Sequence, residues 1–358
     1  MIKVLIVDDS RTARAALRAI LERDSEIFVV GEATNGAEAL KMIRQYDPHF
    51  ITMDIYLERE NGLDITRAIM AKAPRPILVI TGVSPHDPEL GYKAIERGAL
   101  DVFPKPPGPG HAEYEAQSAK LIRLVKTLSK VPVLHQRRHS TVTVHPPLFD
   151  LQIDFDKTIN SRPPDGIDLL LIGASTGGPP VVSGILERLP KPAPMPIIVV
   201  QHITKGFAAG FSEWLGSASG HRTMLVDRTV MIAPGMVYIA SDDANLVFTS
   251  SKTLRSREDP ELGGPRPNID RLFISAADYS RPRTVALVLT GMGSDGAAGL
   301  AHLKRAGATV AVQDPETCVV DSMPKSAIEQ GVEKKLTPDE IVQYLKRRIG
   351  PKTAVTAR

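Results

Sequence analysis

Short apolar runs alternate with amphipathic, helix-like stretches along most of this chain of 358 residues. The alternation is clearest at the start, where the stretches between successive strand-like runs have helical spacing. These runs read IKVLIVDD, FVVGEA, FITMD, PILVITG and LDVFPKP. Strands that are separated by helices favour parallel pairing, because each helix returns the chain to the edge where the previous strand started. The pattern therefore predicts an α/β fold whose sheets are covered by helices on both faces.

The alternation is interrupted by a stretch rich in Pro, His and Arg and resumes after residue 165. We therefore expect a first domain over 1–125, a linker over 126–165 and a second domain over 166–349. The second domain has strand-like runs, helical stretches between several of them, and a hairpin-like insertion in its middle. The runs span 168–174, 196–201, 222–227, 236–240, 246–250, 284–290 and 308–313. We expect both domains to contain a doubly wound parallel sheet.

Composition narrows the class of protein. Lys and Arg number 44 against 41 Asp and Glu, which is too balanced to indicate nucleic acid as the main partner. Cys318 is the single cysteine, so no disulfide can form within the chain, as is usual in the reducing cytoplasm. No leader-like segment opens the sequence, and no apolar run approaches the ~20 residues needed to span a bilayer. We expect a cytoplasmic protein without membrane insertion.

Polar side chains follow the strand-like runs of the first domain. Asp8 and Asp9 end the first run, Asp54 ends the third, and Thr81 and Lys105 end the fourth and fifth. The carboxyl ends of parallel strands share one edge of a sheet, so these residues are expected to lie together. Three carboxylates suit Mg²⁺, and a hydroxyl with an ammonium could hold phosphoryl oxygens. The pattern predicts phosphoryl transfer to the Asp54 carboxylate.

The segments VLIVDDS, MDIYLERENGLD, VITGVS and FPKPP resemble the receiver domain of bacterial response regulators over about residues 1–125. The resemblance implies a flavodoxin-like fold with Asp54 as the phosphoacceptor, and Mg²⁺ that serves receiver phosphorylation only. The other roles fall to residues at the strand ends, with Asp8, Asp9 and Asp54 as metal ligands and Thr81 and Lys105 as phosphate contacts. The resemblance also implies a cis bond between Lys105 and Pro106.

Two positions of the first domain depart from the receiver pattern. The family usually has Met-Pro three and four residues after the acceptor, where this chain has Leu57 and Glu58. The aromatic switch residue usually lies three residues before the lysine, where this chain has Val102, followed by Phe103. The turn after the acceptor is therefore expected to be more acidic, and the usual Thr-to-aromatic route is not indicated by the sequence.

In the second domain, LLLIGASTGG runs from a strand into a glycine-rich turn with Ser175 at its tip. The turn fits G-x-S-x-G, in which small neighbours allow a sharp strand-to-helix elbow to present a nucleophilic hydroxyl. Glycine-rich turns of this kind also bind phosphates through backbone N–H groups. Neither the dinucleotide pattern G-x-G-x-x-G nor the P-loop pattern fits. The motif alone leaves a nucleophile and a phosphate cradle both open.

Two other strand ends could supply partners for the Ser175 hydroxyl. His202 ends the run PIIVVQH, and Asp295 lies in the glycine-rich loop after TVALVLT. A nucleophilic serine needs a base for its proton, and the imidazole needs a carboxylate that orients it and stabilises the imidazolium. His221 begins a strand and is expected at the opposite edge. The spacing therefore predicts a site built from Ser175, His202 and Asp295.

The motifs IGASTGGP, QH, RPNID, LTGMGSDGAAGL and CVVDSMP together resemble the catalytic domain of the chemotaxis protein-glutamate methylesterase family, over about 166–349. With the receiver in front, the whole chain resembles that two-domain response regulator. The resemblance implies a Rossmann-like α/β domain. It also implies these roles: Ser175 as nucleophile, His202 as base, Asp295 as orienting acid, Thr176 near the histidine, and Met292 as an oxyanion donor through its backbone N–H.

The implied activity is phosphorylation-regulated hydrolysis of glutamyl γ-methyl esters on chemoreceptors to glutamate and methanol, with deamidation of receptor glutamines. The implied partners are the cytoplasmic helices of methyl-accepting chemoreceptors and a chemotaxis histidine kinase as phosphodonor, and hydrolysis needs no cofactor. An alternative is a non-catalytic response regulator whose second domain binds a nucleotide or a partner protein. Cys318 has no neighbouring His in the sequence and is expected to be an inert, buried thiol.

Overall fold

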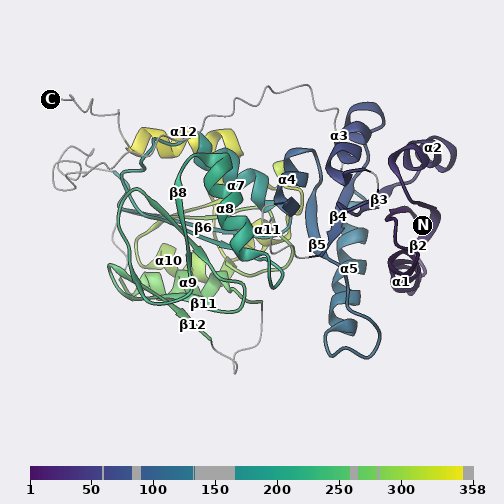
Figure 1. Ribbon diagram of the computed structural model, residues 1–358. Helices are drawn as coiled ribbons and strands as arrows, with labels where there is room; N and C mark the ends of the chain where they lie inside the picture. Colours follow the sequence, from purple (N-terminus) through teal and green to yellow (C-terminus); the bar gives the residue numbers. More distant parts are fainter. Residues whose placement is uncertain are drawn as a thin grey trace. The chain divides into compact units, whose positions relative to one another are not determined.

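The computed structural model describes residues 1–58, 60–82, 90–131, 133, 166–258, 265–279 and 283–349. The chain separates into two compact units, Met1–Val142 and Thr143–Arg358 (Figure 1). The boundary between them, and most of the linker predicted over 126–165, lie outside the described residues. In the described part of the chain, none of the helices combines the length and the apolar character that crossing a membrane requires.

The described strands of the first unit form a five-stranded sheet in the order β2-β1-β3-β4-β5. Neighbouring strands pair in parallel, as predicted from the alternation of strands and helices. The elements are β1 Ile2–Val7, α1 Arg11–Leu21, β2 Ile27–Ala33, α2 Gly36–Tyr46, β3 Phe50–Met53, α3 Gly62–Lys72, β4 Ile77–Thr81, α4 Leu90–Glu96, β5 Asp101–Pro104 and α5 Tyr114–Leu128.

Side-chain caps start three helices of the first unit. The side chains of Ser10, Asn35 and Asn61 accept hydrogen bonds from backbone N–H groups in the first turns of α1, α2 and α3. Strands β3 and β4 are buried along their whole length, because α1 and α5 cover one face of the sheet while α2, α3 and α4 cover the other. The strands therefore end at fixed positions, and the residues that follow them are held at one edge.

The described strands of the second unit form a seven-stranded sheet in the order β15-β14-β13-β6-β7-β10-β8, with a separate antiparallel sheet, β11-β12-β9. The elements are β6 Leu169–Ala174, α7 Gly178–Glu187, β7 Ile197–Gln201, α8 Ala208–Ser219, β8 Arg222–Val226, β9 Val230–Met231, β10 Met236–Ala240, β11 Asn245–Ser250, β12 Thr253–Arg257, α9 Ile269–Ala277, β13 Thr284–Val288, α10 Ala297–Arg305, β14 Thr309–Gln313, η1 Pro315–Thr317, α11 Ser322–Glu329, β15 Lys335–Leu336 and α12 Pro338–Ile349.

The large sheet of the second unit is parallel throughout its described pairs, which confirms the predicted α/β class. Helices α7, α8 and α12 pack together on one face, and α9, α10 and α11 on the other (Figure 1). A hairpin-like insertion was expected in the middle of this unit, and the structure has the antiparallel hairpin β11–β12 there. Strands β9, β12 and β15 were not predicted, because two of them have only two residues and β12 is largely polar.

The sequence of strands in the large sheet creates a switch point at its centre. From β6 the chain proceeds to β7 on one side, and it returns later to β13 on the other side of β6. In open α/β sheets, ligand sites form at the carboxyl ends of the strands where the order reverses. The loops after β6, β7 and β13 are therefore the ones that the topology brings to such a place.

Candidate active site and acidic pocket

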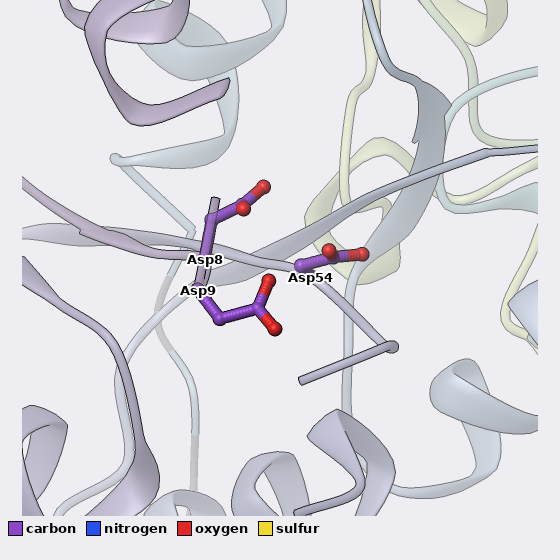
Figure 2. A group of neighbouring side chains, drawn as sticks. All are labelled: Asp8, Asp9 and Asp54. Atoms are coloured by element: carbon purple, nitrogen blue, oxygen red, sulfur yellow. The ribbon is translucent and has the colours of Figure 1, made fainter. Parts of the chain in front are cut away.

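The acidic pocket of the first unit lies where two neighbouring strands end. Asp8 and Asp9 follow β1, and Asp54 follows β3, which pairs with β1. Their carboxylate ligand atoms all lie within 4.8 Å of one another (Figure 2). Asp8 and Asp54 are only 2% and 3% exposed. A cluster of oxygen ligands of this kind has the chemistry that Mg²⁺ prefers, so the residues present fit the ion.

Lys105 neutralises part of the charge in the pocket. Its Nζ lies 2.9 Å from Asp8 Oδ2 and 2.7 Å from Asp54 Oδ2. Burial raises the pKa of Asp54, although the hydrogen bond and the charge of Lys105 oppose this. Burial disfavours the charged form of Lys105 too, but its hydrogen bonds to Asp54 and Asp8 raise its pKa overall. The pocket holds more negative charge than Lys105 balances.

Thr81, at the end of β4, is 2% exposed and lies at the same edge of the sheet. Its Oγ1 is buried and has no hydrogen-bond partner within the described part of the chain. The backbone N–H of Lys105 donates to the Thr81 carbonyl, at 3.1 Å, which joins the two phosphate-contact candidates. A buried hydroxyl without a partner is rare, and it is the group that a bound oxyanion would satisfy.

The cis bond predicted between Lys105 and Pro106 is wrong. The cis bonds of the described residues precede Pro192 and Pro267 instead. The trans form of an X-Pro bond is favoured by about 0.5–1 kcal/mol, and Lys105 reaches both carboxylates without the cis form.

The positions that depart from the receiver pattern are placed as follows. Leu57 is buried, whereas Glu58 is exposed. Phe103 is fully buried under the Lys120 ammonium, whose Nζ is 5.9 Å from the ring centroid, and Val102 is half-buried. The aromatic ring of this strand therefore belongs to the packed interior of the unit.

Ser175 lies at a sharp strand-to-helix elbow in the second unit. Strand β6 ends at Ala174 and α7 begins at Gly178, whose N–H donates to the Ser175 carbonyl at 2.8 Å. Gly177 between them has φ +75°, and a Cβ there would lie 2.5 Å from Val319 Cβ. Only glycine meets both demands. The turn leaves Ser175 7% exposed at the switch point of the sheet.

His202 is the register neighbour of Ser175. Strands β6 and β7 pair Ala174 with Gln201 at their last rung, and Ser175 and His202 are the residues that follow this pair. The N–H of His202 donates to the Ala174 carbonyl at 2.9 Å. Within the described residues, the Ser175 hydroxyl makes no hydrogen bond to the imidazole. The pairing of β6 with β7 therefore places both residues at the same edge of the sheet.

Asp295 completes the cluster from the loop after β13. Its Oδ2 lies 2.7 Å from His202 Nε2 and accepts from the Ile269 N–H at 2.7 Å. Its Oδ1 accepts from the N–H groups of Asp270 and Gly296, each at 3.0 Å. Burial alone would raise the pKa of Asp295, but His202 and the backbone donors at the start of α9 lower it. The carboxylate is therefore held ionised against the imidazole.

The two residues assigned to the oxyanion side also lie near Ser175. Thr176 follows it directly and is buried. Met292 follows Gly291, where a Cβ would lie 2.6 Å from Ser175 Cβ, so this loop packs closely on the serine. Neither the Thr176 nor the Met292 backbone N–H makes a hydrogen bond within the described residues. Both donors remain available to a ligand at the elbow.

Sequence reasoning missed Thr290, which ties these loops together. Its Oγ1 lies 3.0 Å from the Thr176 carbonyl oxygen and 3.1 Å from that of Val320, and it accepts from the Val320 N–H at 2.9 Å. Its own N–H donates to Gln313 Oε1 at 3.0 Å. The motif LTGMGSDG contains this threonine, but nothing in the motif shows partners so distant in the chain.

Two other nucleophile or base candidates have different surroundings. Cys318 is half-buried rather than buried as expected, and its Sγ donates to the Asp314 carbonyl at 3.4 Å. Burial, followed by the charges of Asp321 and Asp314, raises the pKa of Cys318 to about 12, which leaves an unreactive thiol. His221 precedes β8 at the opposite edge, where its Nε2 contacts the Leu186 carbonyl at 2.9 Å.

An α/β unit with a receiver-like acidic pocket, followed by an α/β unit with a Ser-His-Asp cluster, defines a two-domain response regulator with a hydrolase-like second domain. The model of the response regulator receiver domain matches residues 4–113, and the model of the CheB methylesterase matches 170–345. The chain belongs to the CheB methylesterase family, as the motifs predicted.

Relatives match over nearly the whole chain. A protein-glutamate methylesterase/protein-glutamine glutaminase 3 of Anaeromyxobacter dehalogenans is 38% identical over 349 residues, which cover 96% of this chain and 98% of that protein. A protein-glutamate methylesterase/protein-glutamine glutaminase of Nitrosospira multiformis is 38% identical over 345 residues, 95% and 94% of the two chains. The solved CheB methylesterase catalytic domain of Thermotoga maritima is 35% identical, with a TM-score of 0.47, and covers 50% of this chain and 99% of its own.

Proposed function

We propose that this chain is a phosphorylation-regulated protein-glutamate methylesterase that acts in the cytoplasm on glutamyl γ-methyl esters of chemoreceptor helices. The same site would deamidate receptor glutamines, as the names of the relatives suggest. The observation that carries the proposal is the His202 Nε2–Asp295 Oδ2 contact of 2.7 Å, formed beside the register neighbour Ser175. Residues 166–349 would supply hydrolysis, and 1–125 its regulation across the linker 126–165.

The chemistry starts with proton transfer from Ser175 to His202. Since Nε2 of the imidazole faces Asp295, Nδ1 is the nitrogen that takes this proton as the hydroxyl oxygen attacks the ester carbonyl carbon. The ionised Asp295 stabilises the imidazolium that results. The N–H groups of Thr176 and Met292 would donate to the carbonyl oxygen as it becomes an oxyanion, and one such donor is typically worth ~10²–10³ in rate.

The intermediate then collapses in two steps. His202 returns its proton to the leaving oxygen, methanol departs, and Ser175 carries the glutamyl acyl group as an ester. A water molecule gives a proton to His202 and attacks this ester, which releases glutamate and restores the serine. With a glutamine substrate the leaving group is ammonia. These steps need no group beyond the residues of the cluster.

The acidic pocket would receive the regulatory signal. Asp54 is the proposed phosphoacceptor, and a chemotaxis histidine kinase is the proposed phosphodonor. Mg²⁺ held by Asp8, Asp9 and Asp54 would supply positive charge to the phosphoryl oxygens, while Thr81 and Lys105 contact them. Phosphorylation adds about −1.5 to −2 charge, and a free-energy difference of ~1.4 kcal/mol changes a minor population tenfold.

The alternative, a second domain that only binds a nucleotide or a partner protein, is less well supported. Such a domain has no need for a buried, ionised acid that orients an imidazole beside a serine. The motif alone leaves a nucleophile and a phosphate cradle open, and the contact between His202 and Asp295 supports the nucleophile.

Methanol release from methylated receptor membranes tests the proposal. Ser175→Ala should lower the rate by at least about 10⁴-fold without loss of folding, because no other hydroxyl of the cluster can attack. Ser183→Ala, a buried serine of α7, is the matched control and should keep the wild-type rate within a few-fold. Unchanged release by the Ser175 variant would reject the esterase.

A further inference from the structure

Gln201, the last residue of β7, connects the two strand ends that carry the nucleophile and the base. Its side chain is buried, and the residue is 3% exposed. The amide Nε2 donates to the Ser175 carbonyl at 2.7 Å and to the His202 carbonyl at 3.2 Å. A side-chain amide has two N–H groups, so one nitrogen can hold both carbonyls at once.

The backbone ladder explains why this link is needed. The last rung between β6 and β7 is the bond from the His202 N–H to the Ala174 carbonyl. The next rung of a parallel ladder would run from the Thr176 N–H to the His202 carbonyl, and no such bond exists within the described residues. The Gln201 amide donates to the His202 carbonyl in place of the Thr176 N–H. The Thr176 N–H consequently stays unused.

The contacts also settle which way the amide faces. The reversed orientation would place Oε1 against two carbonyl oxygens, so Nε2 must be the group that meets them. Oε1 instead lies at the start of α7, where a Cβ on Gly178 would come within 2.4 Å of it. This oxygen is buried and has no hydrogen-bond partner in the described part of the chain, which costs free energy. The unpaired Oε1 therefore destabilises the fold, while Nε2 of the same amide makes both of its hydrogen bonds at the site.

We propose that Gln201 is a positioning residue for ester hydrolysis. Its amide sets the separation between Ser175 and His202 and keeps the Thr176 N–H available for the developing oxyanion. The inference rests on the proposed function, since it assigns Gln201 a role only if Ser175 and His202 carry the reaction. The buried Gln201 amide faces the Ser175 and His202 carbonyls, so the effect should fall on kcat and not on KM. A misplacement of about 1 Å can cost ~10²-fold in rate.

The first test replaces the amide with an apolar chain of the same length. Gln201→Met should lower kcat for methanol release by about 10- to 100-fold at unchanged KM, and should slow labelling of Ser175 by a phosphonofluoridate by a similar factor. Thr284→Val, at the opposite end of β13, removes another buried polar group and is the matched control. It should keep both rates near the wild-type values at the same folded fraction.

The second test uses Gln201→Glu, which keeps the shape and makes the donor depend on pH. The introduced carboxyl donates one hydrogen bond when protonated, whereas its ionised form repels both carbonyl oxygens. The ratio of its kcat to that of the wild type should therefore rise as the pH falls, which a purely structural defect would not produce. This comparison remains decisive if Gln201→Met does not fold.

The outcomes separate the inference from the function on which it rests. Wild-type kcat and labelling in folded Gln201→Met, or an effect on KM alone, would overturn the positioning role while inactive Ser175→Ala still upheld the esterase. A ratio for Gln201→Glu that is constant with pH would also overturn it. Active Ser175→Ala would remove both.

Discussion

Asp54 in the first unit and Asp295 in the second are both buried at the carboxyl edge of a parallel sheet, yet their pKa values are shifted in opposite directions. Asp54 is 3% exposed and its pKa is raised, whereas Asp295 is 9% exposed and its pKa is lowered. Burial is the largest single influence on both, and it disfavours the charged form of both. The difference must therefore come from the groups that surround each carboxylate.

The number and kind of hydrogen-bond donors explain the difference. Asp54 accepts from Lys105 at 2.7 Å, and from the Tyr56 N–H at a long 3.4 Å, while the Asp8 charge acts against it. Asp295 accepts from three backbone N–H groups and faces His202. Two of these N–H groups belong to the start of α9, where the helix dipole adds to the stabilisation.

The comparison fits the two proposed roles. An acid that is short of donors beside a second carboxylate has unmet demand for positive charge, which a divalent cation would satisfy. An acid that is saturated with donors stays ionised and keeps its orientation, which is what a base partner needs. Similar burial thus accompanies different surroundings, which match the cation site proposed for one unit and the catalytic site proposed for the other.

The largest expected effect concerns the saturated acid. Asp295→Asn should lower methanol release by about 10⁴-fold, because a neutral amide cannot stabilise the imidazolium of His202. The measurement is kcat on methylated receptor membranes. Asp321→Asn makes the same change at a half-buried acid paired with Lys325 and should leave the rate within a few-fold. A similar loss in both variants would contradict the role of the cluster.

The next effect concerns the acid that is short of donors. Mg²⁺ at ~100 times its Kd should stabilise the first unit by about 2.7 kcal/mol. Hydrogen exchange of the full chain should show this as slower exchange in β1 and β3, with β6 and β13 unchanged. Asp8→Asn should abolish the response. Equal protection of both units by Mg²⁺ would mean that the ion binds elsewhere.

Replacing the two acids by Asn should change stability in opposite directions. The pKa of Asp54 is raised in the folded state. Its favourable contribution to stability is therefore present below pH 3.8 and lost as the pH rises through the folded pKa, so Asp54→Asn should stabilise the first unit at pH 7 by about 1 kcal/mol.

The pKa of Asp295 is lowered, so its contribution to stability is present at pH 7 and lost as the pH falls. Asp295→Asn should destabilise the second unit at pH 7 by about 1–3 kcal/mol. Exchange rates in each unit measure both, and shifts of the same sign would refute the donor argument.

The smallest effect concerns Asp270, which lies next to the saturated acid. Burial and the Asp295 charge raise its pKa to about 6, although the Gly299 N–H donates to it at 2.6 Å. Its contribution to stability is therefore present below pH 3.8 and lost between pH 3.8 and about 6. Across that window, Asp270→Asn should gain about 1 kcal/mol of unfolding free energy relative to the wild type. The gain is this small because solvent screens the charge of the half-buried Asp270. Urea unfolding followed by Trp214 fluorescence measures it, and a difference that is constant with pH would contradict the shift.

Much of the fold and part of the site could be predicted because the signals are local. Strand and helix periods show within a few residues, and parallel pairing then places Asp8, Asp54, Ser175 and His202 at strand ends. Gln201 and Thr290 could not be predicted in the same way. Their role depends on carbonyl and N–H groups that lie 26 residues away in the first case and 114 or 30 in the second.

The order of residues along this chain was enough to establish two parallel α/β units and their family, and to predict candidate acids, a serine and a histidine at the strand ends. It did not establish which buried carboxylate has a raised pKa and which a lowered one. Nor did it establish which backbone N–H groups stay free, or how the rung after the last one between β6 and β7 is replaced. Those properties depend on donors that folding brings in from distant segments. A local sequence pattern indicates where a side chain lies on a strand or helix. Its pKa and its hydrogen-bond partners depend on the residues that pack around it in the folded chain.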